Sequence, residues 1–132
     1  EEKCKELGLK PLGKLVSYVT VGCKSDEMGV GPRYAIPKVL ENAGLTLDQI
    51  DIFEINEAFA SQAIYCCREL DIDMEKVNIH GGAIALGHPL GCTGSKLTVQ
   101  IINDLERLNK KYGIVSACVG GGQGIAGIIE RM

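Results

Sequence analysis

The chain has 132 residues, of which 45% are hydrophobic and 23% charged, and its formal net charge is −3. This length suits one domain with a single core, and the composition excludes a disordered chain, a coiled coil and a membrane protein. The basic residues are scattered, so we expect no nucleic-acid partner. Glycine is frequent, at 17 residues, and ten of these lie in two short windows, 81–94 and 120–127.

The first third of the chain predicts the end of a helix, a strand and a second helix. Residues 1–7 are typical of a helix tail that ends at Gly8, which suggests a piece of a longer protein. The segment 15–22 is rich in β-branched residues and predicts a strand. Apolar residues at helical spacing predict a helix over 34–43, with Pro37 in its first turn.

The middle of the chain predicts a short buried strand, 51–55, followed by another helix. Asn56 stands where a helix N-cap belongs, and Glu57 is favourable in a first turn. Capping is the more common role for an asparagine at such a position, and it does not exclude a functional one. The helix should end near Leu70, and its expected apolar face consists of Phe59 or Ala60, Ala63, Ile64, Cys67 and Leu70.

The last third predicts a weak third strand, 77–79, a long helix and a hairpin. The helix follows the glycine-rich loop, and its apolar stripe is Leu97, Ile101, Leu105 and Leu108, with Ile102 beside it. Segments 112–119 and 125–131 are apolar strands joined by a glycine-rich turn, so they should pair antiparallel. The order β-α-β-α-β-α-β-β predicts an α/β fold, with a five-stranded mixed sheet covered by helices.

Three residues capable of chemistry follow or end predicted strands. Asn56 follows the second strand, His88 lies in the loop after the third, and Cys118 is at the end of the fourth. Ligands bind at this edge of an α/β sheet, because strand ends meet helix N-termini there. Each residue also has a structural interpretation: a helix cap for Asn56, a hydrogen-bonded loop histidine for His88 and a small buried apolar residue for Cys118.

The cysteines are interpreted as reduced thiols in a cytoplasmic compartment. Two of the six are adjacent, and no secretory signal pattern is visible; they are Cys4, Cys23, Cys66, Cys67, Cys92 and Cys118. The sequence has no C-x-x-C motif and only two histidines, so we expect no metal site.

Two glycine motifs resemble nucleotide-binding loops but do not meet the requirements for one. The G-x-G-x-x-G of residues 122–127 lies too close to residue 132 for the acidic residue that a dinucleotide site needs about 20 positions later. The segment 91–96 lacks the Gly-Lys-Ser/Thr order of a Walker A motif. Neither motif therefore predicts a nucleotide site.

Three longer motifs resemble the signature blocks of the C-terminal half of thiolases, in the same order and at similar separations. They are Asn56-Glu-Ala-Phe-Ala60, Gly81-Gly-Ala-Ile-Ala-Leu-Gly-His-Pro-Leu-Gly-Cys-Thr-Gly94 and Cys118-Val-Gly-Gly-Gly-Gln-Gly124. The segment Met28–Pro32 extends the similarity upstream, so that it covers essentially the whole chain.

The resemblance implies acyl transfer between coenzyme A thioesters, as in fatty acid metabolism. It implies that His88 takes the proton from a nucleophilic thiol and that Cys118 exchanges a proton with the acetyl-CoA carbanion. It further implies that Asn56 holds a water in one oxyanion hole and that the Gly120 N–H belongs to another. Met28, Ala58 and Phe59 match positions that line the pantetheine tunnel.

The resemblance also sets expectations about the whole protein. Residues 1–132 would be a thiolase C-terminal domain, and the N-terminal half with the nucleophilic cysteine is not part of this sequence. We therefore expect the chain alone to be inactive and the full-length enzyme to be a homodimer or tetramer. No permanently bound cofactor is expected, since coenzyme A thioesters are substrates. The alternative is a separate, non-catalytic domain that serves assembly or binds CoA thioesters.

Overall fold

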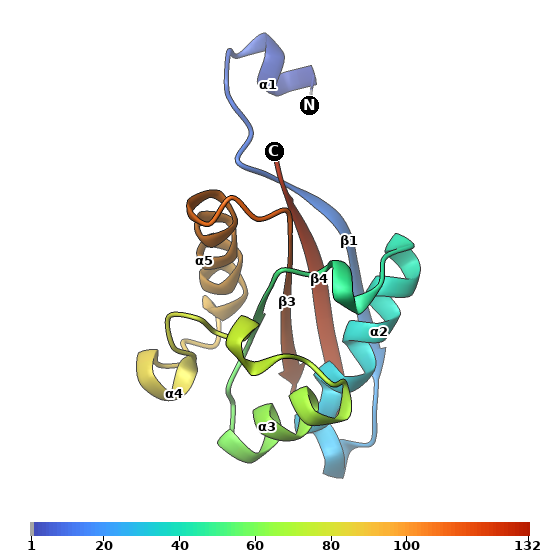
Figure 1. Ribbon diagram of the computed structural model, residues 1–132. Coiled ribbons are helices and arrows are strands. Elements are labelled where there is room, and N and C mark those ends of the chain that lie inside the picture. The colour runs from blue at the N-terminus through green and yellow to red at the C-terminus, as the bar shows by residue number, and fades with distance from the viewer. Residues whose placement is uncertain (1) are drawn as a thin grey trace.

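The computed structural model describes residues 2–132, which form a four-stranded mixed sheet with helices on both faces (Figure 1). The strands are β1 (Gly13–Gly22), β2 (Ile52–Ile55), β3 (Tyr112–Val119) and β4 (Gln123–Arg131), in the spatial order β1-β4-β3-β2. Strand β4 is antiparallel to both of its neighbours, whereas β2 and β3 are parallel. The predicted hairpin and the mixed sheet are thereby confirmed.

The helices divide between the two faces of the sheet. They are α1 (Glu2–Glu6), α2 (Gly31–Ala43), α3 (Ala60–Glu69), α4 (Ala83–Leu86) and α5 (Thr93–Arg107), with the short 3₁₀ turns η1 (Ser25–Val30), η2 (Leu47–Gln49) and η3 (Met74–Lys76). Figure 1 shows α5 on one side of the sheet, with α2 and α3 on the other. Within residues 2–132, no helix is both long and apolar enough to cross a membrane.

Each face of the sheet carries its own core. The larger core joins α2 to the sheet and includes Ile36, Val39, Phe53, Ile114 and Ile128. The smaller core joins α5 to the other face and consists of Ile52, Ile101, Leu105 and Ile129. Successive strand residues point to opposite faces, so Ile128 and Ile129 are buried in different cores.

Helix α2 begins at Gly31, earlier than predicted, and the expectation that Pro37 lies in its first turn is wrong. Pro32 occupies the first turn instead, where its fixed φ favours a helix start. Pro37 lies in the helix interior on the exposed side, where water can replace the lost backbone hydrogen bond. The helix ends as predicted, because Gly44 adopts φ +65° and its N–H bonds back to Leu40 and Glu41.

The prediction of a fifth strand over 77–79 is wrong, because a side chain takes the place of that strand. Val77 forms only an isolated bridge to Phe53. Asn78 has φ +47° and turns its amide toward β2. Its Oδ1 accepts from the Ile55 N–H at 2.9 Å, and its Nδ2 donates to the Ile55 carbonyl at 2.9 Å. The side chain thus makes both hydrogen bonds that a neighbouring strand would make.

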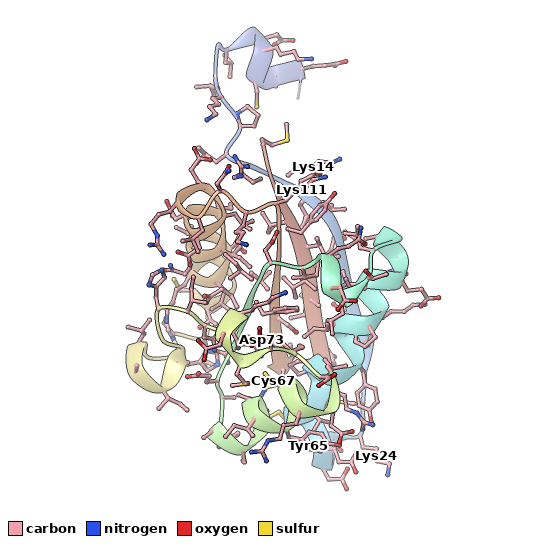
Figure 2. All side chains as sticks on the ribbon, in the orientation of Figure 1. Lys14, Lys24, Tyr65, Cys67, Asp73 and Lys111 are labelled. Carbon is pink, nitrogen blue, oxygen red and sulfur yellow. The ribbon has the colours of Figure 1, made fainter. Side chains whose placement is uncertain are left out.

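Helix α3 begins at Ala60 after Phe59 as its N-cap, so the predicted cap at Asn56 is wrong. Its buried residues include Gln62 and Cys67, whereas Phe59 is 60% and Ile64 is 42% exposed, so the expected apolar face is only partly correct. Figure 2 shows Cys67 inside the molecule and Tyr65 at its rim. The residues that α3 buries are set by its angle to the sheet, which local spacing does not give.

Helix α5 matches its predicted stripe more closely. Leu97, Ile101 and Leu105 are buried. Ile102 is partly buried beside them, as expected. Leu108 lies just beyond the last helical residue and is 40% exposed, so its predicted place in the stripe is wrong. Three turns of the helix therefore pack on the sheet. The N-terminus of the helix directly follows the loop that carries His88.

Candidate active site

Asn56 is positioned by strand β2 rather than by a helix. It follows the last residue of β2, it is 1% exposed, and its N–H donates to the Ser116 carbonyl at 2.8 Å. This bond continues the parallel pairing with β3. The side chain points to the loop before α5, where its Nδ2 lies 3.5 Å from Nε2 of His88. Two residues that are distant in the sequence are thus neighbours in the fold.

His88 lies in an exposed loop between α4 and α5, and that loop is held at several points. Its Nδ1 is 2.7 Å from the Thr93 hydroxyl, which itself donates to the Pro89 carbonyl at 3.1 Å. Lys96 Nζ donates to the Gly87 carbonyl at 3.1 Å, next to His88 in the chain. The imidazole is therefore oriented by contacts on both of its nitrogens.

Cys118 is the penultimate residue of β3 and pairs with Gly124 of β4. Since Ser116 is in register with Ile55, Cys118 and Asn56 lie at the same end of two adjacent parallel strands. Burial raises the pKa of the Cys118 thiol, and the neighbouring Cys23 also raises it, against a lowering by its own backbone N–H. The thiol is consequently protonated at neutral pH and suited to donate a proton.

Gly120 follows the end of β3 and is exposed in the turn of the hairpin. The turn needs glycine, because Gly121 and Gly122 have φ of +88° and +99°. A Cβ on Gly122 would lie 2.5 Å from the Cys23 carbonyl oxygen, which shows how closely the turn packs on the chain after β1. The Cys23 N–H also donates to the Gly122 carbonyl at 2.8 Å. These contacts fix the backbone around Gly120.

Met28 and Phe59 line one open cavity of about 530 Å³ between η1 and α3. The other lining residues are Asp26, Glu27, Gly29, Val30, Ser61, Gln62 and Tyr65. Ala58 is half-buried and precedes Phe59, but it is not among the lining residues. The structure therefore brings two of the three predicted tunnel residues together around one cavity.

Glu57 is a structural link that the sequence did not reveal, since it was interpreted only as a first-turn acid. Its carboxylate accepts from Asn78 Nδ2 at 3.1 Å and from the Ile84 N–H at 3.0 Å. A Cβ on Gly82 would collide with this carboxylate. Glu57 thus joins the Asn56 segment to the start of α4, from which the chain continues to His88. Its place directly after Asn56 was the available signal.

A buried carboxyl lies below this region on β2. Glu54 is 2% exposed, and its Oε1 has no hydrogen-bond partner within residues 2–132. Its pKa is raised to about 7, chiefly by burial and also by the acids Asp104 and Glu57, against a lowering by Lys96. Across the described chain, no group of three His, Cys, Asp or Glu side chains is arranged to hold a metal ion.

The arrangement offers a base, two kinds of hydrogen-bond donor and an acid at one edge of the sheet. His88 Nε2 can accept a proton when it carries the free electron pair of the ring. The Asn56 amide and backbone N–H groups can stabilise negative charge on an oxygen. The protonated Cys118 thiol can give a proton to carbon. Such a set suits reactions in which a carbonyl oxygen gains charge and a carbanion leaves.

Comparison with known proteins identifies the family of this chain. The model of the thiolase C-terminal domain matches residues 9–131. The mouse peroxisomal 3-ketoacyl-CoA thiolase B is 59% identical over 129 residues, which cover 97% of this chain and 30% of that protein. A 3-ketoacyl-CoA thiolase of Bacillus subtilis is 57% identical over 129 residues, covering 98% of this chain and 33% of that protein.

The structural comparison agrees. The crystal structure of human mitochondrial 3-ketoacyl-CoA thiolase in complex with CoA superposes with a TM-score of 0.98 at 48% identity, covering 100% of this chain and 34% of that one. The chain therefore spans about a third of the length of the relatives that it matches. Because the family model matches nearly its whole length, the chain belongs to the thiolase family and corresponds to the C-terminal domain of its members.

Proposed function

We propose that the complete protein containing this chain is a thiolase that transfers acyl groups between coenzyme A thioesters. The observation that carries the proposal is the contact between the Asn56 amide and His88 Nε2 at the end of β2. This contact places a base, His88, next to a hydrogen-bond donor, the Asn56 amide. The names of the relatives, 3-ketoacyl-CoA thiolases, support the same substrate class.

In the cleavage direction, a cysteine thiolate from the remainder of the protein attacks the 3-oxo carbon of a 3-oxoacyl-CoA. His88 Nε2 takes the proton of that thiol. The carbonyl oxygen gains negative charge and is stabilised by N–H donors, among them the Gly120 amide. The bond between the second and third carbon atoms then breaks, and the Cys118 thiol protonates the departing acetyl-CoA carbanion.

In the second half of the reaction, the thiol of coenzyme A gives its proton to the Cys118 thiolate and attacks the acyl-cysteine. The new oxyanion is stabilised by protonated His88 and by the Asn56 side chain through a water. Collapse of this intermediate releases the shortened acyl-CoA and the cysteine thiolate, which takes its proton back from protonated His88. Condensation of two acyl-CoA molecules follows the same steps in reverse, with Cys118 as the base. The cavity at Met28 and Phe59 suits the pantetheine arm, because most of the surface that lines it is apolar.

The test uses the complete protein, with acetyl-CoA as the acyl donor for acylation and acetoacetyl-CoA as the substrate for cleavage. His88→Ala should abolish acyl-enzyme formation from acetyl-CoA, and Cys118→Ser should retain it while slowing carbon–carbon cleavage of acetoacetyl-CoA by ~10² or more, because one proton donor is weakened. Acyl-enzyme is measured by mass spectrometry and cleavage by the loss of substrate absorbance. Normal acylation in the His88→Ala protein would refute its assigned role.

The 132-residue chain by itself should show no thiolysis, because the nucleophile is supplied from elsewhere. Turnover by this chain would contradict that assignment. A complete protein that binds acyl-CoA without turnover would instead favour the non-catalytic alternative. The cytoplasmic location and the dimeric or tetrameric state stay predictions, to be measured by fractionation and light scattering.

A further inference from the structure

The two ring nitrogens of His88 have different neighbours. Nδ1 lies 2.7 Å from the Thr93 hydroxyl, and Nε2 lies 3.5 Å from the Asn56 side-chain nitrogen. In a neutral imidazole, one nitrogen carries the proton and the other accepts. A base that acts through Nε2 needs the proton on Nδ1, so the tautomer decides whether His88 can work in the proposed reaction.

The Thr93 hydroxyl has only one proton to donate, and that proton is already used. It points to the Pro89 carbonyl at 3.1 Å, the same carbonyl that accepts the Thr93 N–H at 2.9 Å and the Cys92 N–H at 2.8 Å. The hydroxyl can therefore only accept from the imidazole, which places a proton on Nδ1. The Asn56 nitrogen is a donor only, so it requires Nε2 to accept. Both neighbours select the same tautomer.

We propose that Thr93 is a positioning residue that holds His88 in the tautomer with the proton on Nδ1 and the free electron pair on Nε2. Thr93 is the first residue of α5 and is 4% exposed, so the hydroxyl is held by the packing of a long helix. The importance of this His88 tautomer for catalysis rests on the proposed function, whereas the assignment of the tautomer does not.

The contact should persist through a reaction cycle. When Nε2 takes a proton, both nitrogens become donors, and the Nδ1–H continues to donate to the Thr93 hydroxyl oxygen. The ring then needs no rotation between its neutral and charged forms. Thr93→Val removes the acceptor while keeping a similar shape, whereas Thr93→Ser keeps the hydroxyl and loses only a methyl group. The pair separates the hydrogen bond from the packing.

The structural test is ¹⁵N nuclear magnetic resonance on the chain labelled at histidine. The wild-type protein and Thr93→Ser should show His88 protonated at Nδ1 at a pH above its titration. In Thr93→Val, the proton should move at least in part to Nε2. A wild-type signal protonated at Nε2, or a Thr93→Val spectrum identical to wild type, would overturn the proposal. His80 serves as an internal reference, and unchanged amide spectra outside residues 87–93 verify folding.

The kinetic test uses the complete protein and measures the rate of acyl-enzyme formation against pH. Thr93→Val should lower this rate by ~10-fold or more and change its lower apparent pKa, while Thr93→Ser should stay within ~3-fold. A merely structural role would leave the pH profile of the remaining activity unchanged. If the tautomer changes but acylation does not, the role of His88 in the proposed function fails and the positioning by Thr93 stands.

Discussion

The proton on the Cys118 thiol is controlled by its position near the end of β3. Burial raises the pKa of this thiol, and the resulting neutral form is a proton donor. A nucleophilic cysteine would need the opposite arrangement, with a nearby cation or helix N-terminus that favours the thiolate. The environment of Cys118 therefore agrees with an acid that acts on carbon.

This environment predicts slow alkylation of Cys118 at neutral pH. Half-maximal reaction with iodoacetamide should require a higher pH in the folded chain than in the same chain unfolded in urea, since burial disfavours the thiolate. Mass spectrometry of the Cys118 peptide gives both curves, and the exposed Cys92 reports on the reagent in each sample. Identical pH dependence in the two states would contradict the prediction.

At the scale of elements, the start of α2 packs directly against the backbone of β4. A Cβ on Gly31 would lie 2.7 Å from the Gly124 Cα, and a Cβ on Gly124 would lie 2.7 Å from the Gly31 Cα. Both residues are buried. Gly124 is also the pairing partner of Cys118, so this contact sets the distance between α2 and the strand beside the thiol.

Alanine at either glycine should therefore destabilise the chain by ~2–3 kcal/mol, because backbone atoms on both sides must move apart. The double variant should cost less than the sum of the two, since one substitution already opens the contact that the other disturbs. Urea unfolding measures each free energy. Gly22→Ala is the matched control, with no heavy atom within 4 Å of its added Cβ, and should change stability by under ~0.5 kcal/mol.

Local patterns predicted the elements whose ends depend on their own residues. The end of α2 at Ala43 and the hairpin of β3 and β4 follow from such signals. The fifth strand and the cap at Asn56 were wrong for a common reason: the groups concerned bond to residues far away in the chain. Asn78 uses its amide on Ile55, and the Asn56 amide faces His88 instead of a helix end. Sequence spacing does not contain such long-range partners.

The residues of the candidate site could likewise be predicted only in part from the sequence. Its main residues were recognisable from motifs and from their places after strands, because topology brings strand ends to one edge. The supporting residues Thr93 and Glu57 were not, since each acts through hydrogen bonds that depend on how a loop is placed. Ala58 was assigned to the tunnel by resemblance and lies beside the cavity without lining it.

At the scale of the whole molecule, the buried Glu54 couples stability to pH. Its pKa rises from the ordinary 4.5 to about 7 on folding, chiefly through burial. Between these values the folded chain holds a proton that the unfolded chain has lost. The contribution of Glu54 to stability is therefore greatest below pH 4.5, falls as pH rises, and levels off above about pH 7.

Glu54→Gln should flatten this dependence, because the amide stays neutral at every pH. The free energy of unfolding of the variant minus that of the wild type should be ~2 kcal/mol larger at pH 8 than at pH 5. Urea titrations at both values measure the difference. Glu75→Gln changes an exposed carboxyl and should show no such trend. A constant offset between Glu54→Gln and wild type would contradict the expected titration.

The Asn78 side chain also determines how the sheet can be extended by another chain. Strand β2 is an outer strand, and outer strands with free N–H and C=O groups recruit strands from other molecules. Here the outward N–H and carbonyl of Ile55 are hydrogen-bonded to the Asn78 side chain. The Asn78 backbone N–H donates to the Phe53 carbonyl at 2.8 Å. A strand from another molecule can therefore join this sheet only along β1. Because pairing is blocked on the β2 side, the aggregation that a second open edge would permit is suppressed.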